Sequence, residues 1–168
     1  TYDFKATIVD PAGNVSGDSL HYGVTVDTVA PDAPIIVRLT DDVAPVAGDV
    51  ADGGHTNDTA PELQGTAEAY STVTIYDGST VLGTAVADVD GNWSYALSGL
   101  VHGTTYDFKA TIVDLAGNVS GDSLHYGVTV DTVAEIPVIT GLIDDVAPVA
   151  GTVADGGHTN DTAPELQG

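Results

Sequence analysis

Apolar and polar residues alternate with a period of two through the middle of the chain, which predicts strands rather than helices. Seven runs show this pattern, at 35–39, 63–67, 73–75, 82–86, 93–97, 106–113 and 124–130. The residues expected to point inward are Ile35, Val37, Leu39, Leu63, Gly65, Ala67, Val73, Ile75, Leu82, Thr84, Val86, Trp93, Tyr95, Leu97, Tyr106, Phe108, Ala110, Ile112, Leu124, Tyr126, Val128 and Val130. Turn sequences rich in Asp, Asn and Gly separate several runs, at 77–79, 90–92 and 116–118.

Seven short strands in about 100 residues are typical of an antiparallel β-sandwich. We therefore expect an all-β protein of tandem immunoglobulin-like (fibronectin III-like) sandwiches with seven strands per repeat. Leu100, Gly103 and Tyr106 have the form of a tyrosine corner, in which the hydroxyl bonds to upstream backbone. The alternative for Tyr106 is an ordinary inward-facing ring.

The chain also repeats itself. Residues 1–30 match 105–134 at every position except Pro11 against Leu115. Residues 41–65 match 144–168 except Asp49 against Thr152. The period is that of an independent domain rather than of a solenoid repeat, which has roughly 20–45 residues. We expect the last two strands of one repeat in 1–29, a complete repeat in 30–133, and the first two strands of the next in 134–168.

Composition excludes several classes of partner and site. The 168 residues include 3 basic and 25 acidic side chains, a formal charge of -22, and no cysteine. Nucleic acid and anionic membranes would repel such a chain, and thiolate zinc sites and disulfides need cysteine. No apolar run approaches the ~20 residues of a membrane span, so no membrane insertion is expected in this segment. An export signal is expected outside these residues.

The acidic residues avoid the expected strands and fall in loops and linkers. In a seven-strand sandwich these loops gather at two ends, which we name the upstream end, where the first strand begins, and the downstream end, where the last strand finishes. The candidates at the upstream end and its linker are Asp27, Asp32, Glu68, Asp88, Asp90 and Asp114. Those at the downstream end and its linker are Asp41, Asp42, Asp58 and Asp131.

Crowded carboxylates favour a counter-ion. Two like charges ~4 Å apart repel by ~1 kcal/mol in water and by ~4 kcal/mol at an intermediate dielectric. Ca²⁺ reverses this repulsion, because it binds six to eight oxygen ligands in forgiving geometry. We therefore expect several Ca²⁺ ions per repeat, with the loops 88–92 and 41–58 as compact sources of oxygen. The alternative is that each acid caps its own turn, since Asp and Asn are common turn residues.

Four motifs follow one another along the chain, Asp27-Thr28-Val29-Ala30-Pro31, Leu63-Gln64-Gly65-Thr66-Ala67-Glu68, Asp90-Gly91-Asn92-Trp93 and Asp114-Leu115-Ala116-Gly117-Asn118. Together they resemble the bacterial immunoglobulin-like repeats of giant Gram-negative adhesins, which are secreted by type I systems and grouped with RTX adhesins. The period and acidity are also similar to the extender arrays of marine ice-binding adhesins. The resemblance implies an extracellular, cell-surface array that Ca²⁺ makes rigid. The junction ligands that it implies are Asp27, Glu68, Asp90, Asp114 and Asp131.

Other functions have less support in the sequence. No spacing of Ser, His and Asp suggests catalysis, so no enzyme and no small-molecule substrate are expected. The serious alternative is a module that binds a carbohydrate or receptor through exposed aromatic rings. Only Tyr70 and Tyr76 are expected to be exposed, which is too few for a convincing platform. The expected partners are therefore neighbouring repeats of the same chain.

Overall fold

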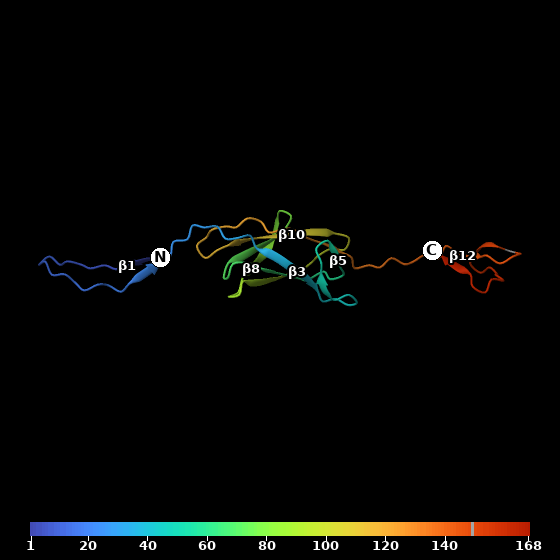
Figure 1. Cartoon of the computed structure of the whole chain (residues 1–168), viewed down its shortest axis with the longest axis horizontal. Helices are drawn as coiled ribbons and strands as arrows, with labels where there is room; N and C mark the ends of the chain where they lie inside the picture. Colours follow the sequence, from blue (N-terminus) through green and yellow to red (C-terminus); the bar gives the residue numbers. More distant parts are fainter. Residues whose placement is uncertain (149) are drawn as a thin grey trace. The chain divides into compact units, whose positions relative to one another are not determined.

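The computed structural model describes residues 1–148 and 150–168, and among them every regular element is a strand (Figure 1). The chain divides into two compact units, residues 1–132 and 133–168. The strands are β1 (Tyr2–Phe4), β2 (Tyr22–Val24), β3 (Ile35–Asp41), β4 (Gly48–Val50), β5 (Gly54–Thr56), β6 (Glu62–Thr66), β7 (Thr72–Asp77), β8 (Thr80–Val86), β9 (Asn92–Ala96), β10 (Thr105–Val113), β11 (Tyr126–Val130), β12 (Gly141–Asp144), β13 (Gly151–Val153) and β14 (Glu165–Gln167).

Strands β3 to β11 form two sheets. One has the order β4-β3-β6-β9 and the other the order β5-β11-β10-β7-β8. All pairs are antiparallel except β5 with β11. This arrangement confirms the all-β, immunoglobulin-like sandwich that the period-two pattern predicts.

The core lies between these two sheets. Leu39 and Leu63 from the first sheet and Ile75, Phe108 and Val128 from the second are fully buried. Burial of each such side chain is worth about 1.5–3 kcal/mol relative to exposure. Every one of these positions is on the face that the alternation predicts to be inward.

A β-bulge makes the prediction for β3 wrong at two positions. Ile35 and Val37 are 60% and 56% exposed, whereas Ile36 packs against the core. The register against β6 shifts between Ile36 and Arg38, so the inward face changes from even to odd positions before Leu39. A bulge adds one residue to a strand, and strict alternation does not reveal it.

A second bulge makes the prediction for β8 wrong in the same way. The register between β7 and β8 shifts beside Leu82, and beyond it Ala85 rather than Thr84 packs against the core. Val86 is 65% exposed. Leu124, also predicted to be inward, is 90% exposed because β11 begins only at Tyr126.

The loop between β3 and β6 contains structure that the sequence pattern did not predict. Strand β4 pairs with β3, and β5 pairs in parallel with β11, so this loop contributes to both sheets. The hydroxyl of Tyr126 donates to the carbonyl oxygen of Val50 at 2.5 Å. The tyrosine corner is confirmed, since the amide of Val101 donates to Tyr106 Oη at 2.9 Å.

The chain enters the complete repeat at one end of the sandwich and leaves it at the opposite end. Ile35 pairs with Thr66 at the start of β3, beside the loop that joins β6 to β7. Val130 pairs with Thr56 at the end of β11, and its carbonyl accepts the amide of Gly103 at 2.8 Å. The incoming and outgoing linkers therefore join opposite ends of this sandwich.

The remaining strands repeat parts of this design. Strands β1 and β2 form an antiparallel hairpin with the sequence of β10 and β11. In the second unit, β12 lies between β13 and β14, as β3 lies between β4 and β6. Among the described residues no helix is long and apolar enough to cross a membrane.

Candidate cation-binding carboxylates

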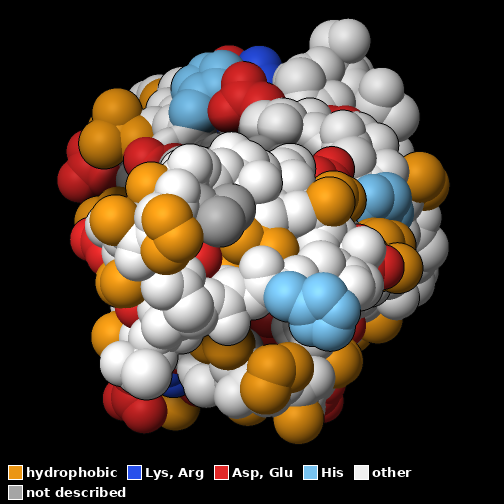
Figure 2. Space-filling view, turned by 90° about the vertical axis from the view of Figure 1, so that its right-hand side faces the viewer, with side chains coloured by type: hydrophobic (Ala, Val, Ile, Leu, Met, Phe, Trp, Pro, Cys, Tyr) orange, Lys and Arg blue, Asp and Glu red, His pale blue; other side chains and the backbone are white. Residues whose placement is uncertain are grey.

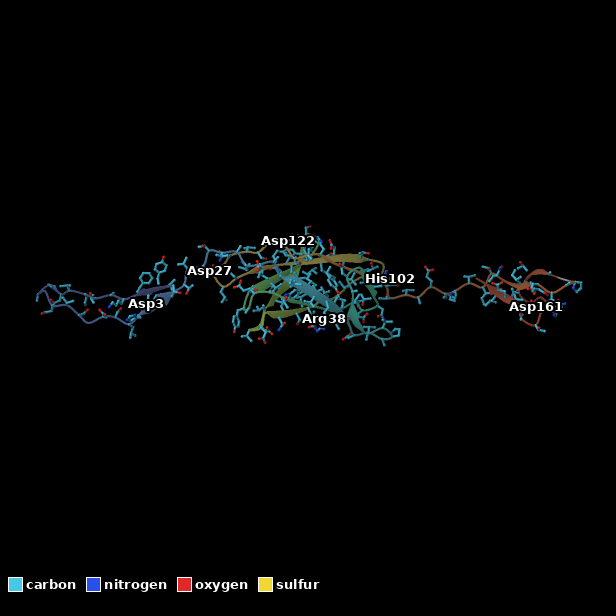
Figure 3. The ribbon with its side chains drawn as sticks, viewed as in Figure 1. Asp3, Asp27, Arg38, His102, Asp122 and Asp161 are labelled. Carbon is cyan, nitrogen blue, oxygen red and sulfur yellow. The ribbon has the colours of Figure 1, made fainter. Side chains whose placement is uncertain are left out.

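Backbone hydrogen bonds draw the loops of the upstream end together. The amide of Ala67 donates to Gly91 at 2.8 Å, and the amide of Ala87 donates to Ser71 at 3.0 Å. The side-chain amide of Asn118 approaches the carbonyl oxygen of Asp27 at 3.4 Å, so the linker also reaches this end (Figure 3). Candidates that are far apart in sequence thus belong to one end of the sandwich.

Two of the predicted ligands at this end cap turns. Asp114 Oδ1 accepts the amides of Ala116 and Asn118, both at 2.8 Å, and its Oδ2 accepts Asn118 Nδ2 at 2.8 Å. The side-chain bond from Asn118 is the main cause of the lowered pKa of Asp114. Asp88 is held by the amides of Asp90 and Asn92, and the bond from Asn92 is the main cause of its lowered pKa.

The same turn recurs in the first copy, where Asp10 takes the place of Asp114. Its carboxylate accepts the amides of Ala12 and Asn14 at 2.9 and 2.8 Å. The change from Leu115 to Pro11 therefore leaves the turn intact. For these Asp residues the capping alternative describes the contacts that are present: Oδ1 accepts two or more hydrogen bonds in each, so the remaining acceptor capacity is on Oδ2.

Three other predicted ligands at the upstream end keep free oxygens. Within the described part of the chain, the carboxylates of Asp32, Glu68 and Asp90 accept no hydrogen bond. Asp32 and Glu68 line one hollow of about 330 Å³ beside the start of β3. Asp27 Oδ1 accepts the amide of Val29 at 3.0 Å, which leaves its second oxygen free.

At the downstream end, two predicted ligands are buried. Asp41 and Asp58 are 2% and 4% exposed, and Thr56 lies between them. The Thr56 hydroxyl donates to Asp41 Oδ2 at 2.6 Å and accepts the amide of Asp58 at 3.0 Å. Asp41 Oδ1 accepts the amide of Val43 at 2.7 Å. This network fixes the loop between β3 and β6.

The last two candidates meet that network through their backbone amides. Asp42 is exposed, and its amide approaches Asp58 Oδ2 at 3.4 Å. The amide of Asp131, in the outgoing linker, donates to the carbonyl oxygen of Thr56 at 2.8 Å, and its Oδ1 lies 3.5 Å from Nδ1 of His102, the residue labelled in Figure 3. They do not join Asp41 and Asp58 in a shared arrangement of oxygens.

The sequence reasoning missed several partners of these acids. Thr56 joins the two buried carboxylates, and the signal for it is a Thr two residues before Asp58 that recurs as Thr159 before Asp161. Asp52 Oδ1 accepts the amide of Gly127 at 2.7 Å, which ties the loop to β11. Thr56 and Asp52 therefore hold the loop between β3 and β6 in place.

The arrangement fits calcium in its chemistry but not through a preformed cluster. Among residues 1–148 and 150–168, no group of three or more His, Cys, Asp or Glu is close enough to hold a metal ion. On the face in Figure 2 acidic side chains are interspersed with apolar ones rather than gathered together. The donors are carboxylate and carbonyl oxygens without sulfur, the set that suits a hard cation. Asp32 and Glu68 are best placed, because both have free oxygens beside one hollow.

Comparison with known proteins agrees with this fold. A search of curated proteins finds no match to the chain. The family model described as "Bacterial Ig-like domain" matches residues 35–132, which cover all strands from β3 to β11. The chain belongs to the bacterial Ig-like domain family.

Proposed function

We propose that residues 30–133 are a structural extender repeat of a bacterial surface adhesin, in which Ca²⁺ at and near the domain junctions makes successive repeats rigid. Asp32 and Glu68 would hold an ion at the upstream end, with Asp27, Asp90 and Asp114 as the other carboxylates there. The ion would supply positive charge where the chain has almost none. By stiffening the linkers, the bound ion would allow the array of repeats to project a distal adhesive domain.

The observation that carries this proposal is where the free carboxylates lie. Asp32 and Glu68 line one hollow beside the linker, and only 3 basic residues offset 25 acidic ones in the chain. The linker from the preceding repeat reaches the sandwich at this end, and Asp27 is one of its residues. A cation at this place would therefore restrain the joint between two repeats.

The expected energy follows from mass action. Extracellular calcium modules bind at roughly 10⁻⁴–10⁻³ M. At about 10 mM free Ca²⁺ one such site would stabilise the folded repeat by about 1.4–2.7 kcal/mol. Inside a cell, where the ion is scarce, the acidic chain would be less stable, which favours export of an unfolded chain.

Thermal unfolding with and without calcium tests the proposal. Trp93 is the only tryptophan and is 3% exposed in the core of the complete repeat, so its fluorescence reports this repeat alone. We expect a higher melting temperature at 10 mM Ca²⁺ than in chelator. Small-angle scattering on several linked repeats should show a larger maximum dimension with the ion. Equal melting temperatures and equal dimensions would reject the proposal.

Matched variants locate the ion. Glu68→Gln removes one charge at the hollow, whereas Asp49→Thr removes one charge by the change that the next copy itself carries as Thr152. Both remove one negative charge, and Asp49→Thr also removes an exposed ion pair with Arg38 at 3.6 Å, which acts alike in calcium and in chelator; only Glu68→Gln is expected to lower the calcium-dependent gain in melting temperature. If the two variants respond equally, general charge screening rather than a site at Glu68 explains the effect.

No observation favours the carbohydrate- or receptor-binding alternative. Among the aromatic side chains of residues 30–133, only Tyr70 is more than half exposed, and Tyr76 is partly buried beneath Lys109. One ring does not form a platform. Ig-like domains are typically non-catalytic, and bacterial members often belong to extracellular or surface proteins. Secretion by a type I system is part of the proposal.

A further inference from the structure

The first and last strands of the complete repeat are the two strands on which a pull along the chain acts. The incoming linker joins the start of β3 at the upstream end, and β11 ends at the downstream end. A pull on the two linkers therefore acts along these strands in opposite directions. Hydrogen bonds of a β-ladder lie across the strands, so such a pull shears many bonds at once instead of opening them one at a time.

Strand β5 links the two segments that the pull would separate. Strands β3 and β11 belong to different sheets, but β5 lies in the loop that follows β3 and pairs with β11. This ladder joins residues 54–56 to residues 128–130, and it is the parallel pair of the sandwich. Because β5 and β11 run in the same direction and are pulled in opposite directions, all three residue pairs are sheared together.

Further hydrogen bonds extend this link to the start of β11. The Tyr126 hydroxyl donates to the carbonyl oxygen of Val50 at 2.5 Å. The amide of Gly53 donates to the carbonyl oxygen of Gly127 at 2.8 Å, and the amide of Gly127 donates to Asp52 Oδ1 at 2.7 Å. Residues 50–56 are therefore bonded along the whole length of β11.

Thr56 bonds to the ends of both pulled strands. Its side chain is buried, and its hydroxyl donates to Oδ2 of Asp41, the last residue of β3, at 2.6 Å. Its carbonyl oxygen accepts the amide of Asp131, the residue that follows β11, at 2.8 Å. Tension along β3 therefore reaches the end of β11 through one residue, without passing through the other strands.

We propose that residues 50–56 form a tension clamp, which transmits a pull from β3 to β11 and keeps the repeat folded when the chain is stretched. Resistance to a pull depends on the unfolding rate, and the bonds that break before the transition state set that rate. Resistance to tension goes beyond the extender function. It does not depend on calcium, because protein groups make every bond of the clamp.

Pulling single molecules in two directions tests the geometry. The 168-residue chain has no cysteine, so pairs of new thiols define where the handles attach. Ala30→Cys with Ala134→Cys pulls along β3 and β11 from exposed linker positions. Thr72→Cys with Val86→Cys pulls apart one residue pair at the open end of the β7–β8 hairpin, whose ladder then opens one pair at a time. At equal force the first tether should stay folded at least about tenfold longer.

The length change identifies the event. Unfolding of the complete repeat between residues 30 and 134 should lengthen the first tether by roughly 300 Å, since about 100 extended residues span at most ~3.5 Å each. Chelator is present throughout, so the result is independent of the calcium proposal, which has its own melting and scattering tests. Equal lifetimes in the two directions would overturn the tension clamp.

Two matched variants locate the clamp. Tyr126→Phe removes the hydroxyl bond to Val50, whereas Tyr106→Phe removes the hydroxyl that accepts the Val101 amide, outside the clamp. When pulled along the linkers, Tyr126→Phe should unfold about fivefold faster at equal force, the effect of one lost hydrogen bond that breaks early. Tyr106→Phe should stay within about twofold of the parent rate, because its bond is still intact when the clamp breaks. Equal effects of the two variants would also overturn the proposal.

Discussion

The buried carboxylate of Asp41 is expected to stabilise the fold through hydrogen bonds, whether or not calcium binds. It is 2% exposed and accepts the Thr56 hydroxyl at 2.6 Å and the amide of Val43 at 2.7 Å. Asp41→Asn keeps the shape and the oxygen that faces Val43. It replaces the second oxygen by an NH2 group, so that two hydrogen-bond donors, this group and the Thr56 hydroxyl, face each other.

The cost follows from the position of that hydroxyl. Thr56 Oγ1 already accepts the amide of Asp58 at 3.0 Å, so in Asp41→Asn its proton has to turn away from a second donor. Loss of a buried hydrogen bond to a charged acceptor costs about 2 kcal/mol. For a domain of about 100 residues this lowers the melting temperature by roughly 8–16 °C.

Fluorescence of Trp93 is the assay, because it reports only the complete repeat. Melting is measured for the parent chain, Asp41→Asn, Thr56→Val and the double variant. Since the two side chains act through one bond, the double variant should lose less than the sum of the single losses, by roughly 1 kcal/mol. Additive losses, or a melting temperature for Asp41→Asn equal to that of the parent, would refute the reasoning.

The same variant separates the structural role from ligation. If Asp41 acts only as a hydrogen-bond acceptor, its replacement lowers the melting temperature equally in calcium and in chelator. If Asp41 also binds the ion, the loss is larger in calcium. We expect equal losses, because both of its oxygens already serve the loop.

Three further changes test other parts of the fold by the same melting assay. Tyr106→Phe removes the acceptor of the Val101 amide and should cost about 1 kcal/mol; an unchanged melting temperature would contradict the tyrosine corner. Gly65→Ala places a methyl group against backbone and the indole ring and should cost at least about 2 kcal/mol, whereas Gly121→Ala meets open space and should be neutral; equal effects would contradict the packing. The lowered pKa of Asp114 means that its stabilisation is present above its unfolded pKa of about 4 and is lost as the pH falls through the lower folded value. Asp114→Asn should therefore reduce the acid sensitivity of melting below about pH 4, and identical pH profiles would contradict this.

The sequence was sufficient for the sandwich because three strands of the second sheet, β7, β10 and β11, keep strict alternation where they are buried on one face. Phe108, Ala110 and Ile112 of β10 are all fully buried, as their spacing predicts. Alternation fails where an extra residue enters a strand and where a strand begins later than the pattern predicts, as at Leu124. The bulges near Ile36 and Leu82 are such places: β3 has no Gly or Pro that would signal the first, whereas Gly83, next to Leu82, is a signal for the second that alternation alone does not use.

The candidate site was less predictable, because a list of acids does not reveal which oxygens are already engaged. Asp88 and Asp32 are both loop carboxylates, yet one caps a turn and the other accepts no hydrogen bond in the described residues. The D-x-D-G-N spacing is compatible with either role. Likewise, the burial of Asp41 depends on the pairing of β5 with β11, which brings Thr56 to it from fifteen residues away.

The engaged carboxylates, such as Asp88 and Asp41, and the free carboxylates, such as Asp32, have different roles in a tandem repeat. The capped and buried acids fold the loops of one repeat, and they are satisfied by that repeat's own amides and hydroxyls. The free acids include Asp32 and Glu68, which accept no hydrogen bond from the residues that the structure describes and lie where the linker enters. Under the proposed function, free acids gain most from an ion supplied by the surroundings, since an added ion cannot replace bonds that already exist without breaking them. Under the proposed function, the joint between repeats would therefore respond to external calcium, while the fold of each repeat keeps the hydrogen bonds of its own turns.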